Sequence, residues 1–323
     1  MMYEEAIGVD SITKSYGRGA LALDGVTFQA AAGAVTALLG PNGAGKTTMI
    51  RILATLLRPD AGRARVGGHD VVTERARVQD LIGLTGQSLS VDGRLSGPEN
   101  LAMFGRLHRL SWPAVRQRSG ELLELFDLKK AGKKAVKTYS GGMRRKLDLA
   151  ISLMAEPRIL FLDEPTTGLD PASRHALWDT IRGLVSQGTT VLLTTQYLDE
   201  ADALAREVVF INAGRVVATG TPAELKAQTG QAQFELIAAS GADFARLTAA
   251  LAAFGHVHGD AVSRAVRVAV GDGGVADLNA ITAAVAQAGV DVERFSLREP
   301  DLDDVYFELT RDLSHPAAAK EMA

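Results

Sequence analysis

The sequence has no cysteine, which excludes disulfide bonds and thiolate metal sites. No apolar run approaches the roughly 18 to 20 residues that a membrane-spanning helix needs; the longest candidates, such as AVTALLG, suit buried strands. The net charge of -3 lacks the basic excess of a polyanion-binding protein, so we expect no nucleic-acid partner. The acidic start, MMYEEAIGVD, does not have the layout of a signal peptide. If the protein acts at a membrane, we expect another subunit to span it.

The composition indicates a globular protein with ample core material, since 46% of the residues are hydrophobic and 23% are charged. A length of 323 residues favours two domains. Over the first two thirds, strand-like runs at residues 34–39, 158–162 and 189–195 alternate with helical segments, which predicts an α/β domain. Between about residues 89 and 156 the strands give way to helices, and a helical insert is expected there.

The alternation resets at GTPAELKAQTG, residues 220–230. Beyond it the pattern predicts strand, helix, strand, helix and strand, with the helices at residues 244–254 and 276–288, and then a last helix in DLDDVYFELT. This order suggests a small ferredoxin-like α+β module. We therefore predict an α/β domain over residues 1–222 and a C-terminal accessory domain over residues 223–323.

The octapeptide GPNGAGKT carries the strongest chemical signal. It fits G-x-x-x-x-G-K-[ST], follows a predicted strand and precedes a predicted helix, which is the context of a phosphate-binding loop. In such a loop backbone N–H groups wrap a phosphate chain, Lys46 reaches the β/γ-phosphates, and Thr47 offers its hydroxyl to Mg²⁺. The predicted nucleotide-binding residues of this stretch are Gly40, Pro41, Asn42, Gly43, Ala44, Gly45, Lys46, Thr47 and Thr48.

Two other polar stretches complement this loop. Asp163 and Glu164 end an apolar strand, where the first could hold Mg²⁺ and the second could orient or deprotonate an attacking water. Ser140, Gly141 and Gly142 open an amphipathic basic helix, and a free helix N-terminus is an anion site. A second phosphate cradle on one chain suggests that each copy binds the nucleotide of the other. Plain helix capping is the alternative for both stretches.

In order and spacing, these motifs resemble those of the nucleotide-binding subunits of ABC transporters, from residue 5 to about residue 222. GPNGAGKTT looks like the Walker A motif, YSGGM like the signature usually written LSGGQ, and ILFLDEP like Walker B. The resemblance implies a P-loop NTPase (ABC ATPase) core that uses ATP and Mg²⁺. It also implies that Gln87 in LTGQSLS contacts Mg²⁺ and the γ-phosphate, that Asp170 in GLD belongs to the D-loop, and that Tyr16 stacks on adenine.

Three stretches narrow the resemblance: TYSGGMRRKLDLA, LTTQYLDEADALA and REPDLDDVYFELT. They look like the drug-resistance exporter group typified by the daunorubicin-resistance ATP-binding protein, whose members carry a C-terminal extension. This implies an ATPase that powers export of drugs, antibiotics or lipids by ATP-driven head-to-tail dimerisation, with a second copy or a paralogous ATPase. It also implies an integral-membrane permease that holds the chain at the cytoplasmic side of the plasma membrane. The C-terminal module would regulate the ATPase or assist assembly.

Gln196 ends a predicted strand at a position where most ABC subunits carry a histidine, and the drug-resistance group shows the same glutamine. Its amide can donate a hydrogen bond to a phosphate oxygen and position water, but it cannot titrate. Glu164 is therefore the expected catalytic base and Gln196 a γ-phosphate sensor. A degenerate, slow site is the alternative.

A non-transport ABC ATPase of translation or DNA repair is the rival function. Translation factors of the family usually carry two tandem cassettes, whereas one is present here. Repair ATPases place a long coiled coil between Walker A and the signature, but no heptad run fills that gap. A P-loop kinase would leave YSGGM unexplained. His256 and His258 are interpreted as ordinary surface residues, because two histidines without further ligands rarely form a metal site.

Overall fold

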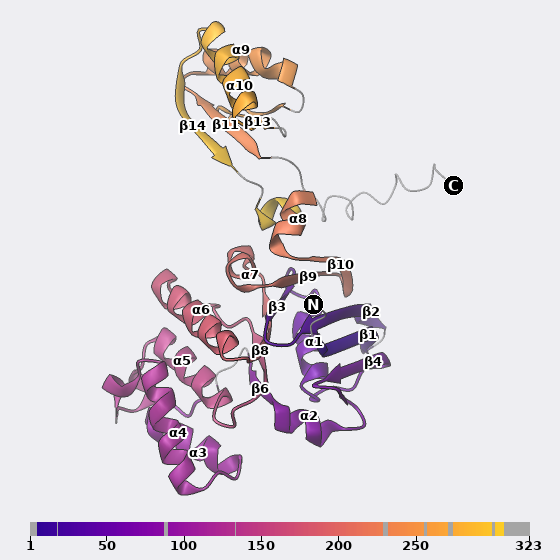
Figure 1. Cartoon of the computed structure of the whole chain (residues 1–323), viewed down its shortest axis with the longest axis vertical. Helices are drawn as coiled ribbons and strands as arrows, with labels where there is room; N and C mark the ends of the chain where they lie inside the picture. Colours follow the sequence, from indigo (N-terminus) through magenta and orange to yellow (C-terminus); the bar gives the residue numbers. More distant parts are fainter. Residues whose placement is uncertain are drawn as a thin grey trace. The chain divides into compact units, whose positions relative to one another are not determined.

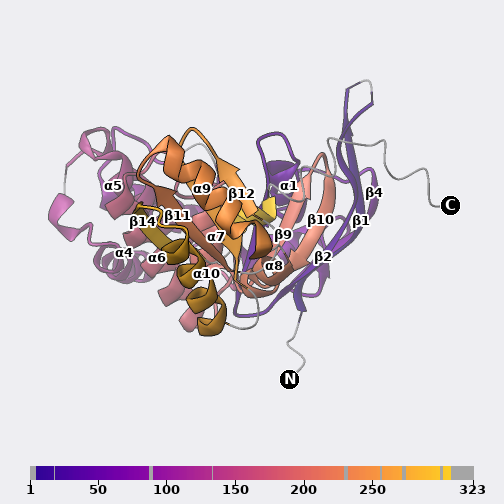
Figure 2. The same ribbon diagram turned by 90° about the horizontal axis from the view of Figure 1, so that it is seen from above.

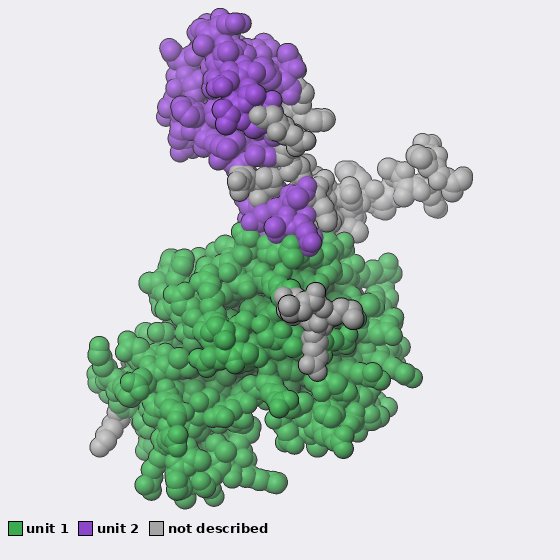
Figure 3. Space-filling view, viewed as in Figure 1, with its two compact units in different colours: residues 1–222 green, residues 223–323 purple. Residues whose placement is uncertain are grey.

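The computed structural model describes residues 5–17, 19–86, 90–132, 134–228, 232–254, 257–270, 274–298 and 301–306. Contacts within the chain divide it into two compact units, residues 1–222 and residues 223–323 (Figure 3). Each unit has a hydrophobic core of its own.

A six-stranded sheet in the order β10-β9-β3-β8-β7-β6 runs through the first unit (Figure 1). Five of its strands are parallel, and β10 pairs antiparallel with β9. Every residue of β3, β7 and β8 is buried, as expected for parallel strands covered on both faces. The strand bounds are β3 Val35–Leu39, β6 Ile82–Thr85, β7 Ile159–Asp163, β8 Thr190–Thr195, β9 Glu207–Asn212 and β10 Arg215–Gly220.

A second, antiparallel sheet has the order β2-β1-β4-β5. Helix α1, Lys46–Leu53, contacts strands of both sheets, and its buried Met49, Ile52 and Leu53 belong to the core cluster that joins them. This core fixes the start of α1, and therefore the loop before it, against the end of β3. The bounds are β1 Glu5–Tyr16, β2 Ala20–Ala31, β4 Ala61–Val66 and β5 His69–Asp70, followed by α2 Arg75–Leu81.

The predicted helical insert is present and consists of α3 (Gly97–Leu107), α4 (Trp112–Leu125), two short 3-10 turns (Lys129–Ala131 and Val136–Thr138) and α5 (Gly141–Ser152). Ser96 and Glu99 form a capping box that starts α3, so the local sequence sets where this helix begins. Figures 1 and 2 show the insert and the β1-β2-β4 sheet at opposite ends of the first unit. After the insert, α6 (Pro171–Ser186) and α7 (Leu198–Leu204) complete the unit.

The second unit begins with most of α8 (Pro222–Gln228) and contains a four-stranded antiparallel sheet in the order β12-β13-β11-β14. With α9 and α10, the chain order is βαββαβ, which is the predicted ferredoxin-like module. One strand was missed: three of the four residues of β12 are exposed, so its sequence has no apolar alternation to predict it. The bounds are β11 Gln233–Ala238, α9 Gly241–Leu251, β12 Val257–Asp260, β13 Ala265–Ala269, α10 Val275–Gln287 and β14 Val292–Arg298.

Of the last predicted helix, only residues 301–306 are described, and they are helical from residue 302. In the described parts of the chain, no helix is both long and apolar enough to cross a membrane.

Candidate active site

The loop between β3 and α1 needs glycine at two positions. A Cβ on Gly40 would lie 2.0 Å from the carbonyl oxygen of Ile211. Gly45 has φ of +107°, and a Cβ there would lie 2.4 Å from the carbonyl oxygen of Ala22. The close packing holds the loop against β2 and β9, with the N-terminus of α1 at its end. A cavity of about 150 Å³ follows the loop; its lining residues are Ala22, Asn42, Gly43, Ala44, Gly45, Lys46, Thr47, Thr48 and Glu164.

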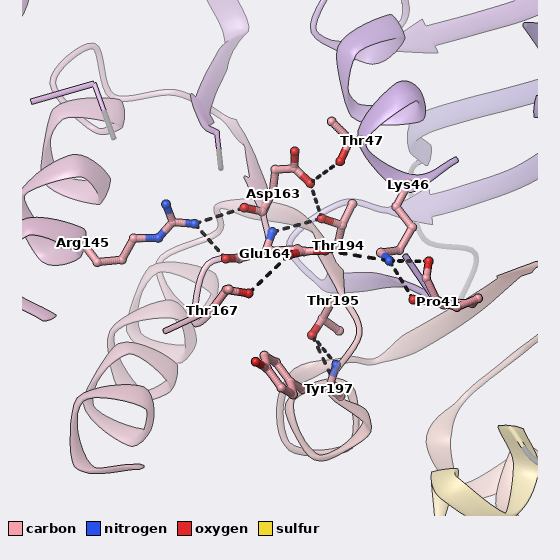
Figure 4. Close-up of polar contacts among 11 residues, drawn as sticks. Pro41, Lys46, Thr47, Arg145, Asp163, Glu164, Thr167, Thr194, Thr195 and Tyr197 are labelled. Carbon is pink, nitrogen blue, oxygen red and sulfur yellow. Dashed lines mark hydrogen bonds and ion pairs between the residues drawn. The ribbon is translucent and has the colours of Figure 1, made fainter. Parts of the chain in front are cut away.

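Lys46 is buried, with 4% of its surface exposed, yet its ammonium group has polar partners. Nζ donates to the carbonyl oxygens of Gly40, at 2.7 Å, and Pro41, at 3.0 Å. It also lies 3.9 Å from Oε1 of Glu164 (Figure 4). Burial lowers the pKa of Lys46, while the charges of Glu164 and Asp163 oppose this shift. A cation held by neutral carbonyls in a glycine-rich loop fits a phosphate chain, which would supply stronger, charged acceptors.

The carboxyl ends of β7, β8 and β3 lie level with one another, because the register pairs Asp163 with Thr194 and Leu39 with Thr195. Oδ1 of Asp163 accepts hydrogen bonds from Thr194 Oγ1, at 2.6 Å, and from Thr47 Oγ1, at 3.2 Å. Two of the three side chains predicted to hold a metal, Thr47 and Asp163, are thus in contact with each other. Among the described residues, no group of three or more His, Cys, Asp or Glu could hold a metal ion. A hydroxyl and one carboxylate instead suit Mg²⁺, which is often shared with substrate phosphates.

Glu164 adopts an unusual backbone conformation for a residue with a side chain, with φ of +50°. Its N–H lies 3.1 Å from both the carbonyl oxygen and Oγ1 of Thr194, which fixes the turn directly after β7. Its Oε2 accepts a hydrogen bond of 3.3 Å from Thr167. Because Glu164 also lines the cavity of the loop, the strained turn presents its carboxylate to that cavity.

Gln196 directly follows β8 and is half-buried. Because Thr195 pairs with Leu39, which precedes the glycine-rich loop, Gln196 lies at the sheet edge that carries the loop. The next residue is fixed by a 2.9 Å hydrogen bond from the Tyr197 N–H to Thr195 Oγ1. Tyr16, at the end of β1, is 44% exposed, and its hydroxyl lies 3.5 Å from Thr48 Oγ1. An aromatic ring therefore stands accessible beside the first turn of α1.

The signature stretch lies at the start of α5. Ser140 caps this helix by accepting a 3.2 Å hydrogen bond from the N–H of Met143. A Cβ on Gly142 would come within 2.7 Å of Ser173 Oγ, and the same Ser173 donates from Oγ, at 2.6 Å, to the exposed Asp170 that caps α6. Ser140 and Asp170 thus belong to neighbouring helix starts, and neither lines the cavity of the glycine-rich loop. Gln87 lies outside the described residues.

One buried carboxyl near this site was not singled out from the sequence. Glu200 of α7 is fully buried, and its Oε1 accepts a 3.2 Å hydrogen bond from Trp178 Nε1. Burial raises the pKa of Glu200, and the hydroxyl of Thr195 opposes that rise. In the described part of the chain, Oε2 of Glu200 and Oγ1 of Thr166 are buried and have no hydrogen-bond partner. The carboxyl therefore lies where α6, α7 and the end of β8 meet.

A family model described as ABC transporter matches residues 23–167, and one described as ATP-binding protein DrrA1-3-like, C-terminal domain, matches residues 220–310. The daunorubicin resistance ATP-binding protein DrrA3 of Streptomyces coeruleorubidus is 50% identical over 311 residues, which is 96% of this chain and 98% of that protein. A doxorubicin resistance ATP-binding protein of Mycobacterium tuberculosis is 46% identical over 95% of this chain and 94% of its own length.

The solved structure of cbiO1 from Clostridium perfringens, part of the ABC transporter complex cbiONQ, has a TM-score of 0.64 and 26% identity. It covers 70% of this chain and 92% of its own. Fold and site together define a P-loop ATPase of the ABC type. The chain belongs to the ATP-binding subunits of ABC transporters, in the family of the daunorubicin and doxorubicin resistance ATP-binding proteins. It is thus an ATPase, as the resemblance predicted, and subunits of this kind work with membrane permeases and dimerise.

The buried carboxyl of Glu200 gives a pH-dependent prediction. Its pKa is raised above 4.5 in the folded state, so the folded protein keeps this proton after the unfolded chain has lost it. This contribution to stability is present below about pH 4.5 and is lost as the pH rises towards the raised value. Glutamine does not titrate, so the variant Glu200→Gln does not lose this contribution. The melting temperature of the variant minus that of the wild type should therefore increase as the pH rises from 4.5 to 8.

Tryptophan fluorescence suits this measurement, since Trp112 and Trp178 both lie in the first unit. Glu121→Gln is the matched control. Hydrogen bonds from Gln117 and Arg118 lower the pKa of Glu121, so any slope should have the opposite sign. A difference between Glu200→Gln and the wild type that does not change with pH would show that this carboxyl is not held neutral by burial.

Proposed function

We propose that this chain powers an exporter of drugs, antibiotics or lipids by hydrolysing ATP between two head-to-tail subunits. One observation supports the ATPase site above all. Two distant parts of the sequence meet at one glycine-rich loop, and they contribute Lys46, Thr47, Asp163 and Glu164. The relatives named for daunorubicin and doxorubicin resistance support the class of cargo.

Binding of ATP would use groups that the fold already presents. The backbone N–H groups from Gly43 to Thr48 would surround the phosphates at the N-terminus of α1. Lys46 would exchange the carbonyl oxygens of Gly40 and Pro41 for β- and γ-phosphate oxygens. The exposed ring of Tyr16 would stack on adenine, beside Thr48.

Thr47, Asp163 and Gln87 are the residues proposed to hold Mg²⁺. Thr47 and Asp163 fit this role because their oxygens already lie 3.2 Å apart, and Thr194 orients the carboxylate from the other side. Once bound, Mg²⁺ would neutralise charge on the β- and γ-phosphates.

Hydrolysis would need a base and a γ-phosphate donor. Glu164 would accept the proton of the attacking water, since its carboxylate lines the phosphate cavity. Gln196 would donate its amide N–H to the γ-phosphate from the adjacent strand end. Because a carboxamide does not take up a proton at neutral pH, the base role would rest on Glu164 alone.

The second half of each ATP site would come from another subunit, either a second copy or a paralogue. Gly141 is exposed, and a Cβ there would meet no atom within 4 Å, so the start of α5 is accessible to a ligand from outside the chain. The capping bond of Ser140 satisfies only the N–H of Met143, and this leaves the amides of Gly141 and Gly142 for a phosphate of the partner's ATP. Asp170 would join this interface from the neighbouring helix start.

The membrane partner would be an integral-membrane permease that holds the chain at the cytoplasmic side of the plasma membrane. Gln87, at the edge of the helical insert, would link the γ-phosphate to the permease-contacting surface. Residues 1–222 would form the nucleotide-binding domain, and residues 223–323 an accessory domain that regulates the ATPase or assists assembly.

The division of roles between Glu164 and Gln196 is open to a direct test. Glu164→Gln should lower kcat below detection, because the amide cannot accept the proton, while affinity for a fluorescent ATP analogue stays within about 2-fold. Gln196→Ala should slow turnover without abolishing it. Steady-state phosphate release measures both variants. Wild-type turnover in Glu164→Gln would refute the assignment of the base.

The membrane partner can be tested by affinity purification of tagged Glu164→Gln from detergent-solubilised host membranes, with ATP and Mg²⁺. The proposal predicts a stoichiometric multi-span membrane protein, identified by mass spectrometry. The Lys46→Ala variant, which removes a phosphate contact, is the control for ATP-dependent recovery. Recovery with ribosomes or DNA instead would support a non-transport ABC ATPase.

A further inference from the structure

Arg145, in the second turn of the signature helix α5, reaches the backbone of residues 163–165. We call these residues, which contain the proposed base Glu164, the catalytic turn. It is 7% exposed, although its guanidinium is charged. Its Nη2 donates to the carbonyl oxygens of Asp163, at 3.1 Å, and Glu164, at 2.9 Å, and its Nε donates to that of Pro165, at 2.7 Å. Figure 4 shows this side chain extending from α5 to the turn after β7. One side chain therefore holds three consecutive carbonyl groups around the proposed base.

The same guanidinium contacts the residue that precedes Gln87 in the sequence. Nη1 of Arg145 donates to the carbonyl oxygen of Gly86, at 2.9 Å. Asp148, one turn along α5 and 2% exposed, lies 3.7 Å from Nη1 and accepts a 2.8 Å hydrogen bond from the N–H of Ser90. Gly86 and Ser90 stand on either side of residues 87–89. Arg145 and Asp148 thus hold both flanks of that segment.

A buried ion pair is a poor source of net stability, because desolvation of both charges opposes their attraction. The role of the Arg145–Asp148 pair is instead to fix the positions of the backbone segments that it contacts. The rigid, planar fork of an arginine presents five donors that reach carbonyls on two separate segments, whereas the three donors of a lysine are gathered on one nitrogen. All four carbonyl partners belong to two motifs that are far apart in sequence, and the helix that carries the fork begins with Ser140 and Gly141.

We propose that Arg145 and Asp148 are a positioning pair that links the two ATP sites of the dimer. The inference rests on the proposed function. In the head-to-tail arrangement, the start of α5 contacts the partner's ATP, while Arg145 holds Glu164 in the chain's own site. Because a helix moves as a rigid element, a shift of α5 on engaging one ATP moves the catalytic turn at the other site, together with the flanks of Gln87.

Arg145→Lys tests this role, since it keeps the charge and removes the fork. The expected result is a kcat lower by about 10- to 100-fold, the range produced by small misplacement of a catalytic group. The KM for ATP should stay within about 2-fold, and the Hill coefficient for ATP should fall towards that of independent sites. Unchanged kcat and Hill coefficient would overturn the proposal.

Arg118→Lys is the matched control. Arg118 also lies in the helical insert, and its Nη2 donates to a backbone carbonyl, that of Leu153, at 3.2 Å, but it contacts neither the catalytic turn nor Gly86. This variant should keep the wild-type kcat. If Arg118→Lys loses as much turnover as Arg145→Lys, the loss reflects damage to the insert and the positioning role is refuted.

Asp148→Asn supplies an independent variant that can still accept from Ser90 while losing its charge. Its effect on kcat should be smaller than, and not additive with, that of Arg145→Lys, because paired residues act as a unit. Additive effects would contradict the pairing.

A wild-type protein without Mg²⁺-dependent ATPase activity would instead refute the proposed function. An active wild type together with an Arg145→Lys variant of unchanged activity would refute this inference alone.

Discussion

The register of three parallel strands is the constraint on which the site depends. Pairing of Asp163 with Thr194 and of Leu39 with Thr195 brings the ends of β7, β8 and β3 to one edge. The 2.6 Å hydrogen bond from Thr194 to Asp163 then fixes the carboxylate, and Thr47 completes the contact from the start of α1. A slip of one residue would turn these side chains away from one another, so the buried core that sets the register also sets the chemistry.

The catalytic turn is held from two sides. Glu164 has a left-handed backbone conformation, which costs on the order of 1 to 3 kcal/mol and persists only where surrounding contacts require it. Thr194 accepts a hydrogen bond from the N–H of Glu164, and Arg145 donates one to the carbonyl oxygen of Glu164. The strain is therefore shared between the central sheet and the signature helix. The position of Glu164, the proposed base, therefore depends on both elements.

Much of the fold and of the nucleotide loop could be predicted, because their signals are local. The phosphate-binding loop needs glycines where Gly40 and Gly45 meet backbone atoms, and a strand and a helix must flank it. Strands β3, β7, β8 and β9 of the central sheet are largely apolar runs. Thr194, Arg145 and Glu200 could not be singled out in this way, because their importance comes from partners about 20 to 60 residues away in sequence.

Two other outcomes have physical reasons of their own. β12 was missed because an exposed edge strand has no hydrophobic pattern, although the helices around it were predicted to within about three residues. Ser140 acts as a helix cap within the single chain, which agrees with the alternative interpretation of plain helix capping. Its proposed anion role requires a second subunit, which a sequence suggests only through the presence of two phosphate cradles.

The central claim is that ATP joins two subunits into one catalytic unit. Light scattering coupled to size exclusion, on Glu164→Gln at micromolar concentration, measures this directly. The account predicts a dimer with ATP and Mg²⁺ and a monomer with ADP, and it predicts that replacing Gly141 by a bulky residue, which blocks the accessible start of α5, removes the dimer. A mass that is the same with ATP, with ADP and without nucleotide would contradict it.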